Sequence, residues 1–254
     1  MRSDIFRRVT DAPREIEQAV VSLARAVFAA GGVLVFGGHP SISPLISLVA
    51  GEYLPVVDGH FLERDVDSRR ERRPSGRPTP IVIHQLDAFR PEIPDATMRM
   101  ALSGQASIVW HETLEGERSK SWALNVPRYP QSLSRMRNEM LGEGAPLANM
   151  LSAMVCVGGM EGVVEEALIF HRLVRRPIFA MARTGGATEL MAHNRRPGGL
   201  AVPDLPFIPI DDEVMGSVSP FLRNEDGEEF EAPARYTPYA AIADEIVRRI
   251  ADSR

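Results

Sequence analysis

The sequence contains very little cysteine and no long apolar run. Cys156 is the only cysteine among 254 residues. A lone cysteine cannot form a disulfide framework or a thiolate metal cluster, so a reducing compartment is favoured. The chain has no stretch of about 18 apolar residues, and its charged first residues lack the apolar core of a signal peptide. We therefore expect a soluble, unprocessed cytoplasmic protein with no membrane partner.

A basic surplus and paired metal-ligand spacing are also missing. The net charge is −5 and the isoelectric point is about 5.7, which disfavours nucleic acids and anionic membranes as main partners. The six histidines show no His-x-x-x-His or similar cluster, so we expect no metal site. These absences favour a small-molecule ligand.

Standard catalytic signatures are absent as well. No Gly-Lys-Ser or Gly-Lys-Thr occurs, which disfavours a P-loop ATPase. The third glycine of a dinucleotide fingerprint is missing, which disfavours an ordinary hydride-transfer dehydrogenase. No Gly-x-Ser-x-Gly elbow is present for a serine hydrolase.

Short apolar segments alternate with amphipathic ones along most of the chain. The spacing predicts a helix over 13–30, a buried strand over 33–36 and a helix with Ser43 as its N-cap. Further strands are predicted over 80–83, 106–110, 153–157 and 177–182, and further helices over 95–102, 132–141, 163–173 and near the C-terminus. This alternation predicts an α/β fold, a single doubly wound Rossmann-like domain over 1–254 with a mainly parallel central sheet flanked by helices. Irregular loops are expected near 63–78 and 195–236.

Two predicted strands run into glycine pairs of one design, "GGHPSIS" from residue 37 and "GGMEGVVEE" from residue 158. In a parallel sheet both turns lie along the carboxyl edge and can face one crevice. Glycine lets the backbone approach a ligand, and helix N-termini suit phosphate oxygens, although the glycines could also serve only a tight turn. A third glycine turn, "TGGAT", could complete the pocket. The candidate ligand-binding residues are Gly37, Gly38, His39, Pro40, Ser41, Ser43, Gly158, Gly159, Met160, Glu161, Gly162, Thr184, Gly185 and Gly186.

Charged and aromatic residues near these turns add further candidates. Glu165 and Glu166 fall in the first turn of the predicted helix, where a carboxylate could bind ribose hydroxyls, activate water or cap the helix. Arg137 could reach a phosphate or lie on the surface. Trp110 could stack on a base or pack in the core.

These motifs together resemble the SLOG superfamily, the Rossmannoid group that includes the Lonely Guy (LOG) phosphoribohydrolases, the DNA-processing protein DprA and ligand-sensing domains of bacterial defence systems. "VLVFGGHPSISPL", "GGMEGVVEE" and "TGGAT" carry the resemblance, which covers roughly residues 15–195. LOG enzymes have Pro-Gly-Gly-x-Gly-Thr-x-x-Glu at the second turn. This chain has Val157 in place of the proline, no threonine after Gly162, and one more residue before its glutamates.

The resemblance implies two functions and leaves the question of enzyme activity open. In the first, the chain binds a nucleotide-derived ligand, ADP-ribose-like or a nucleoside phosphate, as a sensor or carrier. In the second, it hydrolyses the N-glycosidic bond of a nucleoside phosphate, with Glu165 or Glu166 assisting water and Arg137 placing the phosphate. No cofactor is required in either. The family implies a homodimer, and a sensor implies a separate effector protein.

Overall fold

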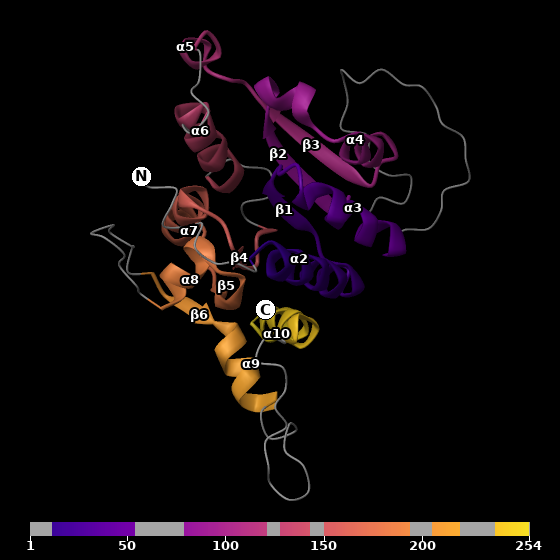
Figure 1. The fold of residues 1–254 in the computed structure, drawn as a ribbon, viewed down its shortest axis with the longest axis vertical. Coiled ribbons are helices and arrows are strands. Elements are labelled where there is room, and N and C mark those ends of the chain that lie inside the picture. The colour runs from indigo at the N-terminus through magenta and orange to yellow at the C-terminus, as the bar shows by residue number, and fades with distance from the viewer. Residues whose placement is uncertain are drawn as a thin grey trace, which may run out of the picture. The chain divides into compact units, whose positions relative to one another are not determined.

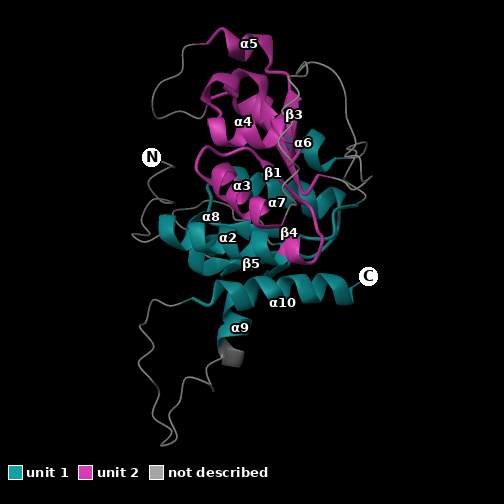
Figure 2. Ribbon diagram, turned by 90° about the vertical axis from the view of Figure 1, so that its right-hand side faces the viewer, with its two compact units in different colours: residues 1–26, 137–254 teal, residues 27–136 magenta. Residues whose placement is uncertain are grey.

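The computed structural model describes residues 12–53, 79–120, 128–142, 150–193, 205–218 and 237–253. The loop predicted near 63–78 lies outside these residues. The chain divides into two compact units, which Figure 2 distinguishes by colour. Unit 1 comprises residues 1–26 and 137–254, and unit 2 comprises residues 27–136. The single domain over 1–254 stays a prediction.

Unit 2 is built on a three-stranded parallel sheet with the order β1-β2-β3. Its strands are β1 (Leu34–Gly37), β2 (Ile81–Leu86) and β3 (Ala106–His111). All six residues of the central strand β2 are buried. Figure 1 shows the connecting helices α3 (Ile42–Tyr53), α4 (Asp95–Leu102) and α5 (Glu115–Arg118), and the 3-10 helix η1 (Asp87–Glu92) follows β2 directly.

Unit 1 contains a second three-stranded parallel sheet with the order β4-β5-β6. Its strands are β4 (Met154–Val157), β5 (Ile178–Met181) and β6 (Phe207–Pro209). The helices of this part are α7 (Glu161–Leu173), the 3-10 turn η3 (Ala182–Thr184), α8 (Gly186–Ala192), α9 (Ile210–Val218) and α10 (Tyr239–Asp252). Two helices, α2 (Ala12–Ala29) and α6 (Pro130–Leu141), begin in one unit along the sequence and end in the other.

The predicted fold class is confirmed, because parallel strands alternate with helices in both units (Figure 1). The apolar periodicity placed α4 at its observed bounds and α2 within one residue. Gly31 ends α2 in a left-handed conformation with φ +71°, and its N–H donates to the carbonyl of Phe28. This is the C-terminal cap that the glycine pair predicted.

Two details differ from the prediction. Residues 207–218, which we expected to be irregular, form β6 and α9. A three-residue strand that contains Pro209 has too few positions to show an alternating pattern. The helix after the first glycine turn begins at Ile42, so Ser43 is not its N-cap. The Ser43 hydroxyl instead accepts the N–H of His39 at 3.2 Å and closes the preceding turn.

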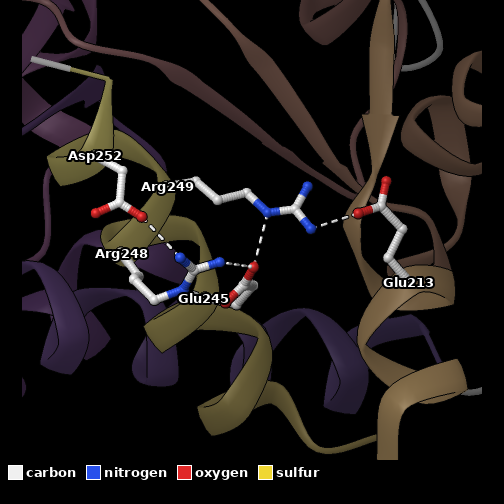
Figure 3. Close-up of polar contacts among 5 residues, drawn as sticks. All are labelled: Glu213, Glu245, Arg248, Arg249 and Asp252. Carbon is white, nitrogen blue, oxygen red and sulfur yellow. Dashed lines mark hydrogen bonds and ion pairs between the residues drawn. The ribbon is translucent and has the colours of Figure 1, made fainter.

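Helix α10 is attached to α9 by charged side chains as well as by its buried apolar face (Figure 3). Arg249 donates to Glu245 at 2.8 Å and also pairs with Glu213 of α9. Arg248 pairs with Glu245 and with Asp252 on its own helix. Hydrogen bonds from the two arginines lower the pKa of Glu245 to about 2, so this carboxylate stays charged at any ordinary pH.

A helix needs about 20 mostly apolar residues to cross a bilayer. No helix in the described ranges is both long and apolar enough to span a membrane.

Candidate functional site

The second glycine turn follows β4 and leads into α7. Gly158 and Gly159 both have left-handed backbones, with φ +54° and +85°. A Cβ on Gly159 would lie 2.2 Å from a methyl carbon of Val163 on α7. Both residues must therefore be glycine for the chain to turn this sharply from strand to helix. Met160 and Glu161, which follow, are exposed, and Gly162 lies in the first turn of α7.

The third glycine turn braces the second. The Thr184 hydroxyl accepts the N–H of Gly158 at 2.7 Å and donates its own proton to a carbonyl at the end of β5. The Thr188 hydroxyl donates to the carbonyl of Gly158 at 2.7 Å, and the N–H of Ala187 donates to that of Gly159 at 2.9 Å. Both threonines are fully buried. The Thr184 hydroxyl thus has a structural use within this turn, whereas its role toward a ligand stays a prediction.

Gly185 and Gly186 make this bracing possible. Their φ angles are +73° and +63°, which side-chain-bearing residues rarely adopt. A Cβ on Gly186 would lie only 2.5 Å from the carbonyl oxygen of Gly159. The two turns therefore approach as bare backbone, at the carboxyl ends of the paired strands β4 and β5.

Arg137, Glu165 and Glu166 form one cluster beside the second turn. Arg137 Nη1 lies 2.6 Å from Glu165 Oε2, and its Nε lies 3.3 Å from Glu166 Oε1. The arginine side chain is only 16% exposed, and the carboxylates are 33% and 23% exposed. Gly162 gives the guanidinium room, because a Cβ there would lie 2.6 Å from Arg137 Nη2. The three residues that sequence reasoning proposed for catalysis are thus brought together on α6 and α7.

The cluster contains one guanidinium and two carboxylates, so a single positive charge faces two acidic groups. Burial raises the pKa of Glu166, the positive charge and hydrogen bond of Arg137 oppose this rise, and the charge of Glu165 adds to it. Burial and the charge of Glu166 also raise the pKa of the Cys156 thiol, to about 12. The buried thiol is therefore not a nucleophile at neutral pH, and Glu166 holds a proton more readily than an ordinary glutamate does.

The position of the two glutamates differs slightly from the expectation. Helix α7 begins at Glu161, so Glu165 and Glu166 lie beyond its first turn. Their carboxylates contact Arg137 on α6 rather than the backbone at the start of α7. A capping role for them is therefore replaced by an ion-pair role.

The first glycine turn lies in unit 2, between β1 and α3. Gly37 ends β1, and the N–H of Gly38 donates to the carbonyl of His84 at 2.9 Å. The N–H groups of His39 and Ser43 are bonded within the turn, to the Ser43 hydroxyl and to the His39 carbonyl. These amides are therefore used by the fold in this conformation. Pro40 and Ser41 are exposed on the same turn.

The His39 ring is the chemically most specific group of this turn. Its Nδ1 accepts the N–H of Ser41 at 3.2 Å. An accepting Nδ1 places the proton of the neutral ring on Nε2, which makes Nε2 a hydrogen-bond donor. His39 is exposed, so this donor is available for a ligand contact.

Sequence reasoning missed two features of these sites. It did not include Thr188, although two threonines four residues apart around a glycine pair could have suggested a brace. It also did not pair His84 with His111, whose ring nitrogens lie 2.8 Å apart on the adjacent strands β2 and β3. Within the described part of the chain, no group of three or more His, Cys, Asp or Glu residues is arranged to hold a metal ion.

We expect Gly162→Ala to change the cluster without unfolding the protein. The new Cβ would meet only the flexible end of Arg137, so the free energy of unfolding should change by less than about 1 kcal/mol. The guanidinium would shift while staying paired with the carboxylates, and retention of the expected nucleotide ligand should fall by about tenfold because the position of the arginine changes. Thermal denaturation and ligand retention followed by mass spectrometry measure the two effects.

Gly51→Ala is the matched control for that substitution. Gly51 also lies in a helix, α3, but a Cβ there would meet nothing within 4 Å. It should raise the free energy of unfolding by roughly 0.5–1 kcal/mol and leave ligand retention unchanged. Equal retention in both variants would show that the contact between Gly162 and Arg137 does not matter for binding.

We expect Glu166→Gln to stabilise the protein more as the pH rises. Because the pKa of Glu166 is raised by burial, its favourable protonated form is present below the unfolded-state pKa and is lost as the pH rises through the folded-state pKa. Glutamine resembles the protonated form at every pH. The melting temperature of the variant minus that of the wild type should therefore increase between pH 4 and pH 8.

Glu165→Gln is the comparison for this pH series. Glu165 is more exposed than Glu166 and makes the shorter contact with Arg137. Its substitution should lower the free energy of unfolding by about 0.5–1.5 kcal/mol at pH 7, because a charged hydrogen bond is lost. A melting-temperature difference for Glu166→Gln that stays flat or falls with pH would contradict the assigned direction of its pKa.

Part of the chain is similar to a family of known proteins. The model of the SLOG cluster3 family matches residues 81–204. No curated protein and no solved structure matches the chain significantly. At the family level, the match indicates a nucleotide-related ligand-binding or LOG-like function.

The matched segment contains the Arg137 cluster and the second and third glycine turns, whereas the first turn lies before it. The match therefore agrees with the resemblance to the SLOG superfamily that the second and third glycine turns carry, over residues 81–204.

Proposed function

We propose that this protein binds a nucleotide-derived ligand, ADP-ribose-like or a nucleoside phosphate, as a sensor or carrier. The observation that carries the proposal is the Arg137, Glu165 and Glu166 cluster, whose guanidinium lies against Gly162 in the first turn of α7. An arginine beside a helix N-terminus can bind a phosphate, and carboxylates can accept hydrogen bonds from ribose hydroxyls.

The exposures of the three side chains support a division of roles. Glu165 is the most exposed of them, at 33%, and can reach a ligand hydroxyl with little rearrangement. Arg137 is already held by two carboxylates, so a phosphate would share its N–H groups with Glu165 and Glu166. The N-terminus of α7 can add amide donors next to Gly159, although the N–H of Val163 already donates to the carbonyl of Met160.

A second candidate is hydrolysis of the N-glycosidic bond, and the raised pKa of Glu166 favours it. A carboxyl group whose pKa lies closer to neutrality exchanges protons more effectively in general acid–base catalysis. In this reaction a water molecule adds to the anomeric carbon, its proton passes to the carboxylate, and the base leaves on accepting a proton. Arg137 would hold the phosphate of the substrate.

One experiment separates these two functions. The purified protein is incubated with nucleoside monophosphates, NAD, ADP-ribose and cyclic ADP-ribose isomers, and the bound and free pools are analysed by mass spectrometry. Retention of one intact compound, lost in Arg137→Gln, supports the binding function. Release of free base, lost in Glu166→Gln, supports the hydrolase. With a folded protein, neither retention nor release would contradict both.

A further inference from the structure

The carboxyl end of the sheet in unit 2 carries a row of polar and aromatic groups. Gln85 on β2 pairs in register with Trp110 on β3, so both side chains point to the same face of the sheet. Gln85 Nε2 donates to the carbonyl of Gly38 at 3.2 Å, and a Cβ on Gly38 would lie 2.7 Å from this nitrogen. The row therefore runs from the first glycine turn across β2 to the indole of Trp110.

Arg90 extends this row. It lies on η1, the 3-10 helix that follows β2, and its guanidinium carbon is 4.3 Å from the centre of the Trp110 ring. Trp110 is half-buried and Arg90 is exposed. Stacking on an indole fixes the plane of a guanidinium while its N–H groups remain free to bind an anion at the edge. Arg90 covers one face of the indole, and stacking of a base on the other face of Trp110 stays a prediction.

Two neighbouring arginines differ from Arg90 in one respect. Arg118 pairs with Asp87, and Arg128 pairs with Glu92. Among the described residues no carboxylate pairs with Arg90, and its side-chain contact is the indole. No carboxylate of the described residues therefore neutralises its positive charge, and the two acidic residues of the same 3-10 helix pair with other arginines.

We propose that Arg90 binds a phosphoryl oxyanion and that Trp110 is the positioning residue that orients it. Three observations support this site: the free guanidinium, its fixed plane, and its place on the same face as the Gly38 peptide and the Gln85 amide. A planar guanidinium presents paired N–H groups that match two phosphate oxygens. The inference rests on the proposed function only in that the oxyanion is taken to belong to a nucleotide-derived compound, and the site is argued from residues of unit 2 alone.

Trp110 also provides the measurement. The chain has two tryptophans, Trp110 and Trp122, so the full-length Trp122→Phe variant has one emitting indole. Inorganic pyrophosphate and ADP-ribose are titrated separately into this parent at low and high salt, and indole emission is recorded. The same titrations are made on variants of this parent that also carry Arg90→Gln, Arg90→Lys or Arg118→Gln. Circular dichroism checks that each variant is folded.

We expect pyrophosphate to change the Trp110 emission of the parent saturably, and added salt to weaken the effect. Arg90→Gln should weaken the binding of pyrophosphate at least about tenfold. The affinity of Arg90→Lys should lie between those of the parent and of Arg90→Gln, because lysine keeps the charge but loses the planar donors. Arg118→Gln removes the same charge from an arginine that already has a carboxylate, so its titration should match the parent.

The proposal is overturned if Arg90→Gln titrates like the parent, or if the folded parent responds to neither pyrophosphate nor ADP-ribose. The outcome for the nucleotide function is separate. Equal ADP-ribose binding by the parent and by Arg90→Gln would keep the nucleotide function and remove Arg90 from it. Pyrophosphate binding through Arg90, with no nucleotide retained from the panel, would keep the anion site and remove the nucleotide function.

Discussion

Gly186→Ala is expected to lower the free energy of unfolding by about 2–5 kcal/mol. The residue has φ +63°, and a side chain in the left-handed region costs roughly 1–2 kcal/mol. The added Cβ would also lie 2.5 Å from the carbonyl oxygen of Gly159, which is backbone and cannot rotate away. Thermal denaturation should show a fall in melting temperature of roughly 5–15 °C for a chain of this size.

Gly104→Ala is the matched control for the backbone cost. Gly104 has φ +72°, but a Cβ there would meet nothing within 4 Å. This substitution should cost only roughly 1–2 kcal/mol. If Gly186→Ala and Gly104→Ala lowered the free energy of unfolding equally, the close approach of the third glycine turn to the second would not contribute to stability. In Gly186→Ala we also expect nucleotide retention to fall, because the brace holds the second turn.

Arg137→Ala is expected to have the second large effect, on both stability and binding. It removes the cation between Glu165 and Glu166 and leaves two partly buried carboxylates facing each other. Breaking a fully buried pair costs about 3–5 kcal/mol, and we expect about 2–3 kcal/mol because these carboxylates are partly solvated. By mass spectrometry, retention of the nucleotide should be abolished if the protein is a binder, and release of free base should be abolished if it is a hydrolase.

Arg135→Ala and Arg137→Lys are the comparison variants. Arg135 lies on the same helix but is exposed, so its removal should change the free energy of unfolding by no more than about 0.5 kcal/mol. Arg137→Lys keeps a positive charge but cannot contact both carboxylates in one plane. Compared with Arg137→Ala, it should restore more of the free energy of unfolding than of the nucleotide binding. If Arg137→Ala and Arg135→Ala had equal effects, the cluster would be an ordinary surface ion pair.

The helices and strands with strong periodicity were predictable because their signals are local. The turns of α4 and α2 each repeat apolar residues at helical spacing, and glycines mark their ends. The strands β2, β4 and β5 were recognisable as short apolar runs between turn residues, and β2 and β5 are fully buried. Strand β6 and helix α9 were not predicted, because β6 has three residues and α9 directly follows it.

The Arg137 cluster was predictable in its membership but not in its geometry. Spacing and the family resemblance both singled out Arg137, Glu165 and Glu166. Their pairing depends on how α6 and α7 pack, and this places the guanidinium against the Gly162 backbone. A residue on an amphipathic helix can face inward or outward, and only the packed neighbour decides which.

The sequence by itself determined the parallel α/β class, most of the helices and strands, and the three glycine turns. These follow from side-chain periodicity and from the backbone freedom of glycine, which act over a few residues. Only the tertiary structure decided that Thr184 and Thr188 brace the second turn, that His84 pairs with His111, and that Arg90 lies on Trp110. The His84 and His111 rings, for example, are 27 residues apart in the chain, and their 2.8 Å contact exists because parallel strands set their register through backbone hydrogen bonds.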